Sequence, residues 1–312
     1  MVESKHKWKA WLYLAPAIIL LLIFTVWPII NTLHLSVQEG YDQAKAIGGM
    51  KFEYGFGNFE SVVKYSGFVT AMKNTIILCV LTVPISTILA LVIAVCLNSI
   101  GPLSRFLQTI YFLPYVTNSI AIGMVFAAMF NIVGSNIGEP EQLITTAGII
   151  NNLIEFFGGE PVNWINAGSS YWANITVMTI YIVWNALPFK ILILLGGLQS
   201  VNKQYYDAAK VDGTSRFRVF SKITVPLLSP MIAYVVITGF IGGFKEYSSI
   251  VGIFGDDMGH SGDREMDTMV GYIQDNIDKL QGRASAAALI LFGIIFIVTM
   301  INLYVSKKKT HY

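Results

Sequence analysis

The sequence contains little charge. Only 13% of its 312 residues are Asp, Glu, Lys or Arg, 54% are hydrophobic, and the mean hydropathy is +0.60. A soluble globular chain usually carries about a quarter charged residues. This chain lacks the charge needed to cover a water-facing surface, so its composition is typical of an integral membrane protein.

Residues that perform covalent chemistry or bind metals are also scarce. The two cysteines, Cys79 and Cys96, lie in one apolar run, and on one helix they would be roughly 25 Å apart, too far for a disulfide. No Gly-x-x-x-x-Gly-Lys-Ser/Thr phosphate loop occurs, so the chain is not expected to hydrolyse a nucleotide itself. No chain of carboxylates or histidines crosses the apolar runs as a proton relay would. We therefore expect no catalytic residue, metal ligand or cofactor in this chain.

Long apolar runs dominate the sequence. Each of six stretches is long enough to cross a bilayer, which takes about 20 mostly apolar residues: 11–36, 70–98, 105–131, 172–199, 225–252 and 284–306. The first stretch follows three lysines, as in a signal peptide, but it exceeds an apolar core of about 7–15 residues and no small-x-small cleavage site follows. The pattern predicts an all-α integral membrane protein with six transmembrane helices in one domain, residues 11–306.

Charges are sorted between the two sides of the predicted spans. With the N-terminus inside, the inner segments hold twelve basic residues: Lys5, Lys7, Lys9, Arg105, Lys203, Lys210, Arg216, Arg218, Lys222, Lys307, Lys308 and Lys309. The outer segments hold six: Lys45, Lys51, Lys64, Arg264, Lys279 and Arg283. Inner loops of membrane proteins are enriched in Lys and Arg. We therefore expect residues 1–10, the loop 200–226 and the tail 307–312 to be cytoplasmic.

The loop 200–226 is helix-patterned although it is not a span. Ser200 is expected to cap a first helix, Gly213 to end it, and Thr214 or Ser215 to cap a second helix. Both helices are apolar on one face and basic on the other, and together they are too short to bury a core of their own. The apolar face must meet the span ends, anionic lipid head groups or another protein.

The spacing within this loop resembles a known motif. Asp207-Ala208-Ala209, three residues, Gly213, nine residues, Ile223, one residue and Val225-Pro226 resembles the EAA loop of binding-protein-dependent ABC importer permeases. That pattern reads Glu-Ala-Ala, three, Gly, nine, Ile, one, Leu-Pro. Asp207 and Val225 depart from it but keep the charge sign and the apolarity.

The resemblance extends over nearly all of residues 11–306. LAPAIILLLIFTVWP, YFLPYVTNSIAIGMVF, GGLQSVNKQYYDAAKVDG and GRASAAALILFGIIFIV look like segments of the sugar-importing branch, similar to the larger maltose permease subunit. This resemblance implies a type I ABC importer permease fold in a bacterial or archaeal cell membrane. It also implies uptake of a carbohydrate, an oligosaccharide or a glycoside.

The resemblance implies several partners as well. These are a second homologous permease, a cytoplasmic ATPase dimer that uses ATP and Mg, an extracytoplasmic sugar-binding protein and membrane lipid, with no nucleic acid. In this family the EAA loop transmits closure of the ATPase dimer to the membrane helices. Here the expected ATPase-coupling residues are Asp207, Ala208, Ala209, Asp212 and Gly213.

The fifth predicted span carries a stripe of small residues that ends in a carboxylate. Gly239, Gly242, Gly243 and Glu246 are spaced i, i+3, i+4, i+7, which is one face of a helix. Small residues alone would indicate close helix packing. Because a carboxylate is costly against lipid, the stripe with Glu246 favours a cavity that accepts a polyhydroxylated cargo. The resemblance to maltose-type permeases also places this face along the pathway.

The fourth predicted span supplies further candidates for the pathway. Asn185 is suited to hydrogen-bond a hydroxyl beside the small Ala186, and Phe189 or Trp184 to stack on a sugar ring. Trp184 is equally suited to pack between helices. Lys190 is equally suited to pair with an acidic group of a partner subunit or to meet substrate.

Two other functions remain open from the sequence. The same kind of permease could carry glycerol phosphate or another small polar solute, although Glu246 disfavours a phosphate. An ion-coupled secondary transporter would need no ATPase, but that reading leaves the loop spacing unexplained.

Overall fold

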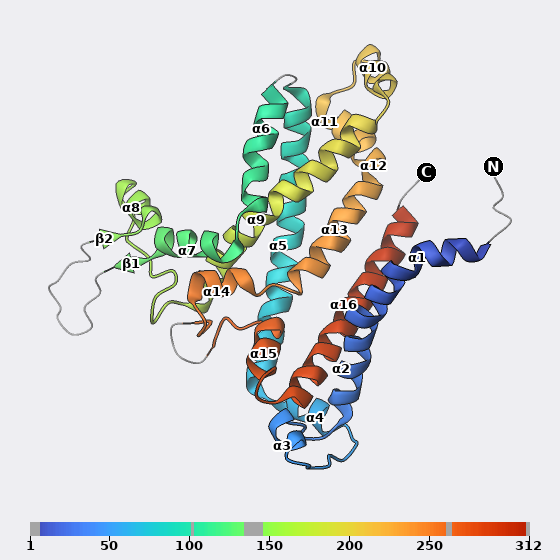
Figure 1. Cartoon of the computed structure of the whole chain (residues 1–312). Coiled ribbons are helices and arrows are strands. Elements are labelled where there is room, and N and C mark those ends of the chain that lie inside the picture. The colour runs from blue at the N-terminus through green and yellow to red at the C-terminus, as the bar shows by residue number, and fades with distance from the viewer. Residues whose placement is uncertain (1–6, 101–102, 134–145, 260–263, 310–312) are drawn as a thin grey trace. The chain divides into compact units, whose positions relative to one another are not determined.

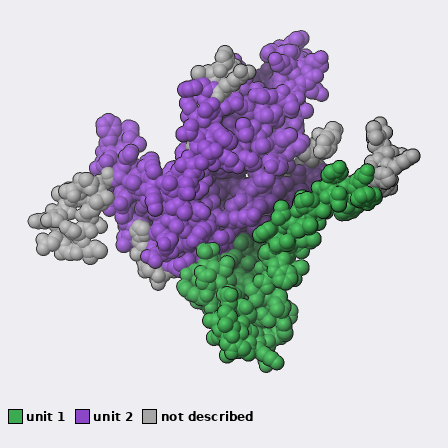
Figure 2. Space-filling view, viewed as in Figure 1, with its two compact units in different colours: residues 1–68, 272–292 green, residues 69–271, 293–312 purple. Residues whose placement is uncertain are grey.

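The computed structural model describes residues 7–100, 103–133, 146–259 and 264–309. The chain divides into two compact units, one made of residues 1–68 with 272–292 and the other of residues 69–271 with 293–312 (Figure 2). Each unit is described by itself.

The first unit is built from helices. They are α1 (Lys7–Leu21), the π-helical η1 (Leu22–Val26), α2 (Trp27–Val37), α3 (Gln43–Ile47), α4 (Gly57–Lys64), the start of α5 (Ser66–Ser99), the end of α15 (Met269–Asn276) and the first part of α16 (Gln281–Lys309). The first three join into one apolar segment, Trp11–Val37, in which Ser36 is the only residue buried within the chain. Its apolar side chains therefore require lipid or a partner protein around them.

One buried asparagine, Asn58, links the end of α2 to the start of α4. Asn58 is 3% exposed, and its Nδ2 donates to Ser36 O at 3.0 Å and to Gln38 O at 2.7 Å. Its Oδ1 accepts from Gly40 N at 3.3 Å. These bonds satisfy backbone groups where α2 ends and hold the start of α4 beside them.

The second unit contains the rest of the chain. Its elements are most of α5 (Ser66–Ser99), α6 (Leu103–Phe112), the 3-10 helix η2 (Leu113–Val116), α7 (Ser119–Phe130), β1 (Ile132–Val133), β2 (Thr146–Ala147), α8 (Ile149–Phe156), α9 (Tyr171–Ser200), α10 (Lys203–Val211), α11 (Arg216–Val219), the π-helical η3 (Phe220–Thr224), α12 (Val225–Leu227), α13 (Ser229–Gly243), α14 (Ser248–Phe254), the start of α15 (Met269–Asn276) and the end of α16 (Figure 1). Strands β1 and β2 pair antiparallel, with Ile132 opposite Ala147.

Four of the predicted spans are confirmed as single helical segments. Among the described residues, four are long and apolar enough to cross a membrane: Trp11–Val37, Ser66–Ser99, Tyr171–Ser200 and Gln281–Lys307. The expectation that the other two apolar runs, 105–131 and 225–252, form continuous helices is wrong. Each is divided, and each division has a local cause.

The third run breaks between α6 and α7. Pro114, in η2, has no backbone N–H to donate within a helix. Asn118 then caps α7 in an extended backbone conformation, and its Oδ1 accepts from Ile120 N at 2.9 Å. As a result α7 turns away from the direction of α6 (Figure 1).

The fifth run breaks after α13. Helix α13 ends at Gly243, after a Gly-Gly pair that is poor in helix propensity, and α14 begins at Ser248. The backbone carbonyl of Glu246, freed by the break, accepts from Thr268 Oγ1 at 2.8 Å. At its other end α13 joins the segment Arg216–Leu227 through a bend of 69°.

The core of the second unit lies along α9. Tyr181 is completely buried in a cluster contributed by α5, α7, α9 and α14, and its hydroxyl donates to Ser119 O at 2.8 Å. Helices α7 and α14 cross closely at Gly123 and Gly252, where a Cβ on Gly123 would lie 2.6 Å from Gly252 Cα. This packing fixes the first part of α9, and Ile182, which belongs to the cluster, also lines the site described next.

Candidate functional site

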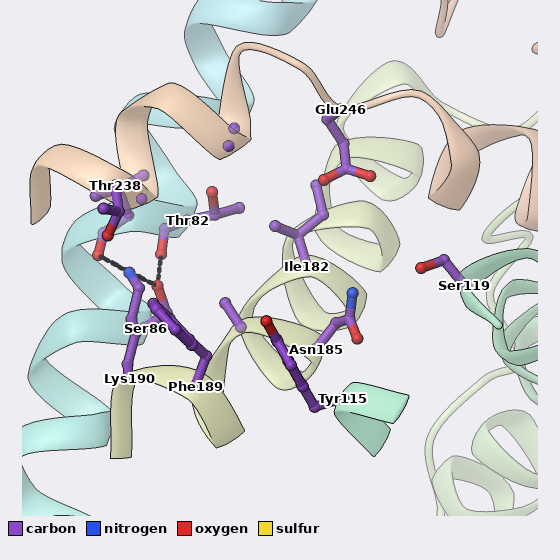
Figure 3. A pocket seen from close by; sticks show the side chains of 15 residues that line it. Thr82, Ser86, Tyr115, Ser119, Ile182, Asn185, Phe189, Lys190, Thr238 and Glu246 are labelled. Atoms are coloured by element: carbon purple, nitrogen blue, oxygen red, sulfur yellow. Dashed lines mark hydrogen bonds between the residues drawn. The ribbon is translucent and has the colours of Figure 1, made fainter. Parts of the chain in front are cut away.

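A cavity of about 540 Å³ lies within the second unit (Figure 3). Its wall comes from α5, η2, α7, α9, α13 and the segment after α13. The lining residues are Thr82, Val83, Ser86, Tyr115, Ser119, Ile182, Asn185, Ala186, Phe189, Lys190, Thr238, Gly239, Gly242, Gly243 and Glu246. The structure thus brings together all seven residues predicted for the pathway: Asn185, Ala186, Phe189, Gly239, Gly242, Gly243 and Glu246.

Helical spacing explains why these residues share a wall. On α9, Ile182, Asn185, Ala186 and Phe189 follow one another at i, i+3, i+4 and i+7. Residues at this spacing lie on one face of a helix. Tyr115 stacks on Phe189, with ring centroids 5.8 Å apart and planes 15° apart.

The glycines of α13 serve two purposes. A Cβ on Gly243 would lie 2.8 Å from Cys79 Sγ, and a Cβ on Gly239 would lie 3.2 Å from Val83 Cγ1. Both glycines therefore allow α13 to approach α5 closely. A Cβ on Gly242 would meet nothing within 4 Å, so Gly242 contributes open space.

Lys190 is buried at the side of the cavity and is 3% exposed. Its Nζ donates to Ser86 Oγ at 2.7 Å, to Thr87 Oγ1 at 3.0 Å and to Val83 O at 3.3 Å. An ammonium has three N–H groups, so these bonds use all of them. The sequence left open a partner subunit or a substrate as its contact, and the structure shows the lysine bound to α5.

Glu246 lies on the opposite side of the cavity from Lys190 (Figure 3). Its carboxylate accepts a hydrogen bond from Ser249 Oγ and lies against the backbone N–H groups of Tyr247 and Ser249. These groups lie at the start of α14, so the carboxylate faces the N-terminus of that helix. The cavity therefore holds a fixed ammonium at one side and a carboxylate at the other.

Several lining residues were missed from the sequence. Thr82 and Ser86 stand at i, i+4 inside an apolar run, a signal that could have placed one polar face of α5 on the cavity. Tyr115 and Ser119 enter only because the third run breaks. Trp184 does not line the cavity and packs on Phe126, with ring centroids 5.4 Å apart.

The first helix of the loop 200–226 begins two residues later than expected. The prediction that Ser200 caps its first helix is wrong, because α9 continues through Ser200, whose Oγ donates to Gly197 O at 2.7 Å. Asn202 caps α10 instead, accepting from Gln204 N at 3.0 Å. Ser215 stands at the cap position of α11, as expected, without a capping side-chain hydrogen bond.

Gly213 ends α10, which confirms that prediction. Its φ is +62°, a left-handed conformation that favours glycine. Gly213 N donates to Lys210 O at 3.1 Å and Thr214 N donates to Ala209 O at 2.9 Å. These two bonds form a Schellman motif, which satisfies the last carbonyls of the helix.

The expected coupling residues lie on and beside α10. A pocket of about 410 Å³ is lined by Ala208, Ala209 and Asp212, together with Asn202, Gln204, Tyr205, Thr214 and Ile223. Asp207 is exposed and pairs with Lys210, and Gly213 is exposed at the turn. Two large apolar side chains of the loop, Val211 and Phe217, are 89% and 79% exposed, which makes this a surface suited to a protein contact.

Comparisons with known proteins agree with this architecture. The family described as "Binding-protein-dependent transport system inner membrane component" matches residues 83–311. The lactose transport system permease protein of Rhizobium radiobacter is 29% identical over 300 residues, covering 94% of this chain and 91% of that protein. The arabinooligosaccharides transport system permease protein of Halalkalibacterium halodurans is 28% identical over 307 residues, covering 97% and 89%.

A similar fold occurs in a crystal structure of a bacterial alginate ABC transporter in complex with an alginate pentasaccharide-bound periplasmic protein. The TM-score is 0.77 at 21% identity, covering 98% of this chain and 96% of that one. Together with its several membrane-spanning helices, the match over residues 83–311 shows that this chain is a multi-pass membrane protein that belongs to the family of binding-protein-dependent transport system inner membrane components.

Proposed function

We propose that this chain is the permease subunit of an ABC importer for a carbohydrate, an oligosaccharide or a glycoside, and that its cavity forms part of the pathway. The observation that carries the proposal is the gathering of seven residues from two sequence stretches around one cavity of about 540 Å³. Ligand pockets of proteins usually measure about 300–1,000 Å³.

The chemistry of the wall suits a sugar. The stacked rings of Tyr115 and Phe189 offer an aromatic face to the apolar side of a pyranose or furanose ring. Asn185 and the Thr238 hydroxyl supply hydrogen-bonding groups, and Glu246 supplies acceptors. The names of the lactose and arabinooligosaccharide relatives support the same class of cargo.

The loop 200–226 serves as the contact with a separate ATPase. Asp207, Ala208, Ala209, Asp212 and Gly213 form this contact, and the exposed Val211 beside them supports the assignment. The ATP and Mg belong to the ATPase dimer. A second permease completes the pathway, an extracytoplasmic sugar-binding protein delivers the cargo, and both termini of this chain are cytoplasmic.

Purification tests the assembly. The chain is extracted from its native membrane in a mild detergent, and copurifying proteins are identified with their stoichiometry by mass spectrometry. We expect an ATPase in two copies and a second permease. Recovery of this chain alone, still able to transport, would overturn the proposal in favour of an ion-coupled transporter.

A matched pair of glycine variants tests the cavity. Gly242 and Gly196 both have nothing within 4 Å of an added Cβ, but only Gly242 lines the cavity. Proteoliposomes containing the complex are assayed for uptake of lactose, maltotriose, arabinotriose, an alginate trisaccharide and glycerol phosphate. Gly242→Leu should lower uptake of the transported sugar at least tenfold, whereas Gly196→Leu should not. Equal uptake by both variants would remove the cavity from the pathway.

A further inference from the structure

We infer that the cavity admits uncharged carbohydrates and excludes cargo that bears a carboxylate, phosphate or sulfonate. This inference rests on the proposed function, because it assigns a charge class to the cargo of the same cavity. The comparisons leave that class open, since lactose is neutral whereas the alginate of the structural relative is acidic.

To bind in the cavity, an anion needs above all a cationic side chain with a free donor. Lys190 is the ammonium of this cavity, and none of the other described lining residues is Lys, Arg or His. All three N–H groups of Lys190 are already donated to α5. An anion could take one only by displacing a hydroxyl or a carbonyl of α5.

The acceptors around Lys190 are themselves fixed. The Ser86 hydroxyl donates to Thr82 O and the Thr87 hydroxyl donates to Val83 O, so their lone pairs face the ammonium. On the other side α13 covers the lysine, because a Cβ on Gly239 would lie only 3.1 Å from Nζ. Lys190 is therefore a fixed link between α9 and α5 and does not serve as an anion site.

The carboxylate of Glu246 has the opposite relation to the cavity. It borders the space opposite Lys190, near Ile182 (Figure 3), and its protein donors come from the start of α14. A carboxylate accepts sugar hydroxyls well. It repels an anion in the same space, and between charges in a partly buried site this repulsion is weakly screened. The Glu246 side of the cavity therefore disfavours negative charge, and the Lys190 side offers an anion no free N–H donor.

If Glu246 acts by holding the start of α14, its variants should behave differently than if it acts through its charge. Glu246→Gln keeps the size and the acceptor for Ser249 but removes the charge. Ser249→Ala removes the hydroxyl donor but keeps the charge. If Glu246 acts through its charge, only the first variant changes the selectivity between neutral and acidic ligands.

The test uses matched ligands on the full complex in nanodiscs without binding protein, so that only the permease selects. The probes are the alditols of lactose, maltotriose and arabinotriose, each paired with the corresponding aldonate, which has a carboxylate in place of the C1 hydroxymethyl group, and Kd is measured by calorimetry. We expect the wild-type complex to bind the neutral member of its preferred pair at least tenfold more tightly, Glu246→Gln to reduce this ratio to threefold or less, and Ser249→Ala to keep it.

Equal or tighter wild-type binding of the aldonate, or an unchanged ratio in Glu246→Gln, would overturn the inference while leaving a carbohydrate permease intact. Absence of binding by every probe, together with absence of uptake of every sugar in the panel above, would overturn the proposed function and the inference with it.

Discussion

Substitution of Gly213 separates the backbone of the coupling loop from its side-chain contacts. Its φ is +62°, and an added Cβ would meet nothing within 4 Å. A substitution therefore acts through backbone strain and not through a clash. An ordinary L-residue in this conformation costs about 1–2 kcal/mol relative to glycine, Asn costs less, and a β-branched residue costs more.

The magnitude follows from the backbone strain of a β-branched residue at this positive φ. Gly213→Val should disfavour the turn by about 2 kcal/mol, which reduces the population of the native turn roughly 30-fold relative to a frayed one. Fraying releases the carbonyls of Ala209 and Lys210 from the N–H groups of Thr214 and Gly213. Because the proposed ATPase contact surrounds this turn, its loss should uncouple ATP hydrolysis from uptake.

The assay compares three variants of the reconstituted complex. Sugar taken up per ATP hydrolysed should fall in the order Gly213→Asn, Gly213→Ala, Gly213→Val, and hydrogen exchange at the Thr214 amide should speed up in the same order. Subunit stoichiometry by mass spectrometry serves as the control for assembly. Wild-type coupling in Gly213→Val, with faster exchange at Thr214, would refute the link between this turn and transport.

Three further substitutions probe the second unit. Lys190→Met removes three hydrogen bonds between α9 and α5 and should lower thermal stability by an amount equivalent to about 1–3 kcal/mol; an unchanged melting temperature would contradict the fixed link. Gly243→Ala places a Cβ 2.8 Å from Cys79 Sγ and should cost about 1–3 kcal/mol, which the double variant with Cys79→Ala should largely restore. Asn74→Leu leaves the carbonyls of Glu265 and Asp267 without their donor, so the Met269 amide should exchange at least tenfold faster; equal exchange would show that Asn74 does not hold this loop.

Apolar length and helical spacing were enough to predict four spans and one wall of the cavity. The breaks in the other two apolar runs were not equally visible in the sequence. Pro114 and Asn118 mark the first break locally, but the length of the apolar run outweighed them. At the second break the Gly242-Gly243 pair is a weak local signal, and the hydrogen bond from Thr268 Oγ1 to Glu246 O joins residues too far apart in the chain to leave a periodic pattern in the sequence.

The candidate site was predictable from the sequence only where its residues lie at helical spacing on one span. Residues at helical spacing on one span must share a face, so the groups on α9 and α13 could be assigned together. The contact of Lys190 with Ser86 joins residues 104 positions apart, and nothing local indicates it. The start of α10 was misplaced because Ser200 and Asn202 are both good caps, and only the continuation of α9 decides between them.

Four of the contacts that helix α5 makes lie on one row of residues. Thr75 accepts from the Met269 amide, Cys79 faces Gly243, Val83 faces Gly239, and Thr87 accepts from Lys190. These four residues of α5 are spaced by four along about 18 Å of helix. A turn of α5 about its own axis would therefore break the loop contact, the α13 contacts and the α9 contact in one movement, and a one-residue insertion between Cys79 and Val83 would put the two halves of the row on different faces. Through this row α5 contacts α9, α13 and the segment at Met269, so a rotation of α5 would change all three contacts together.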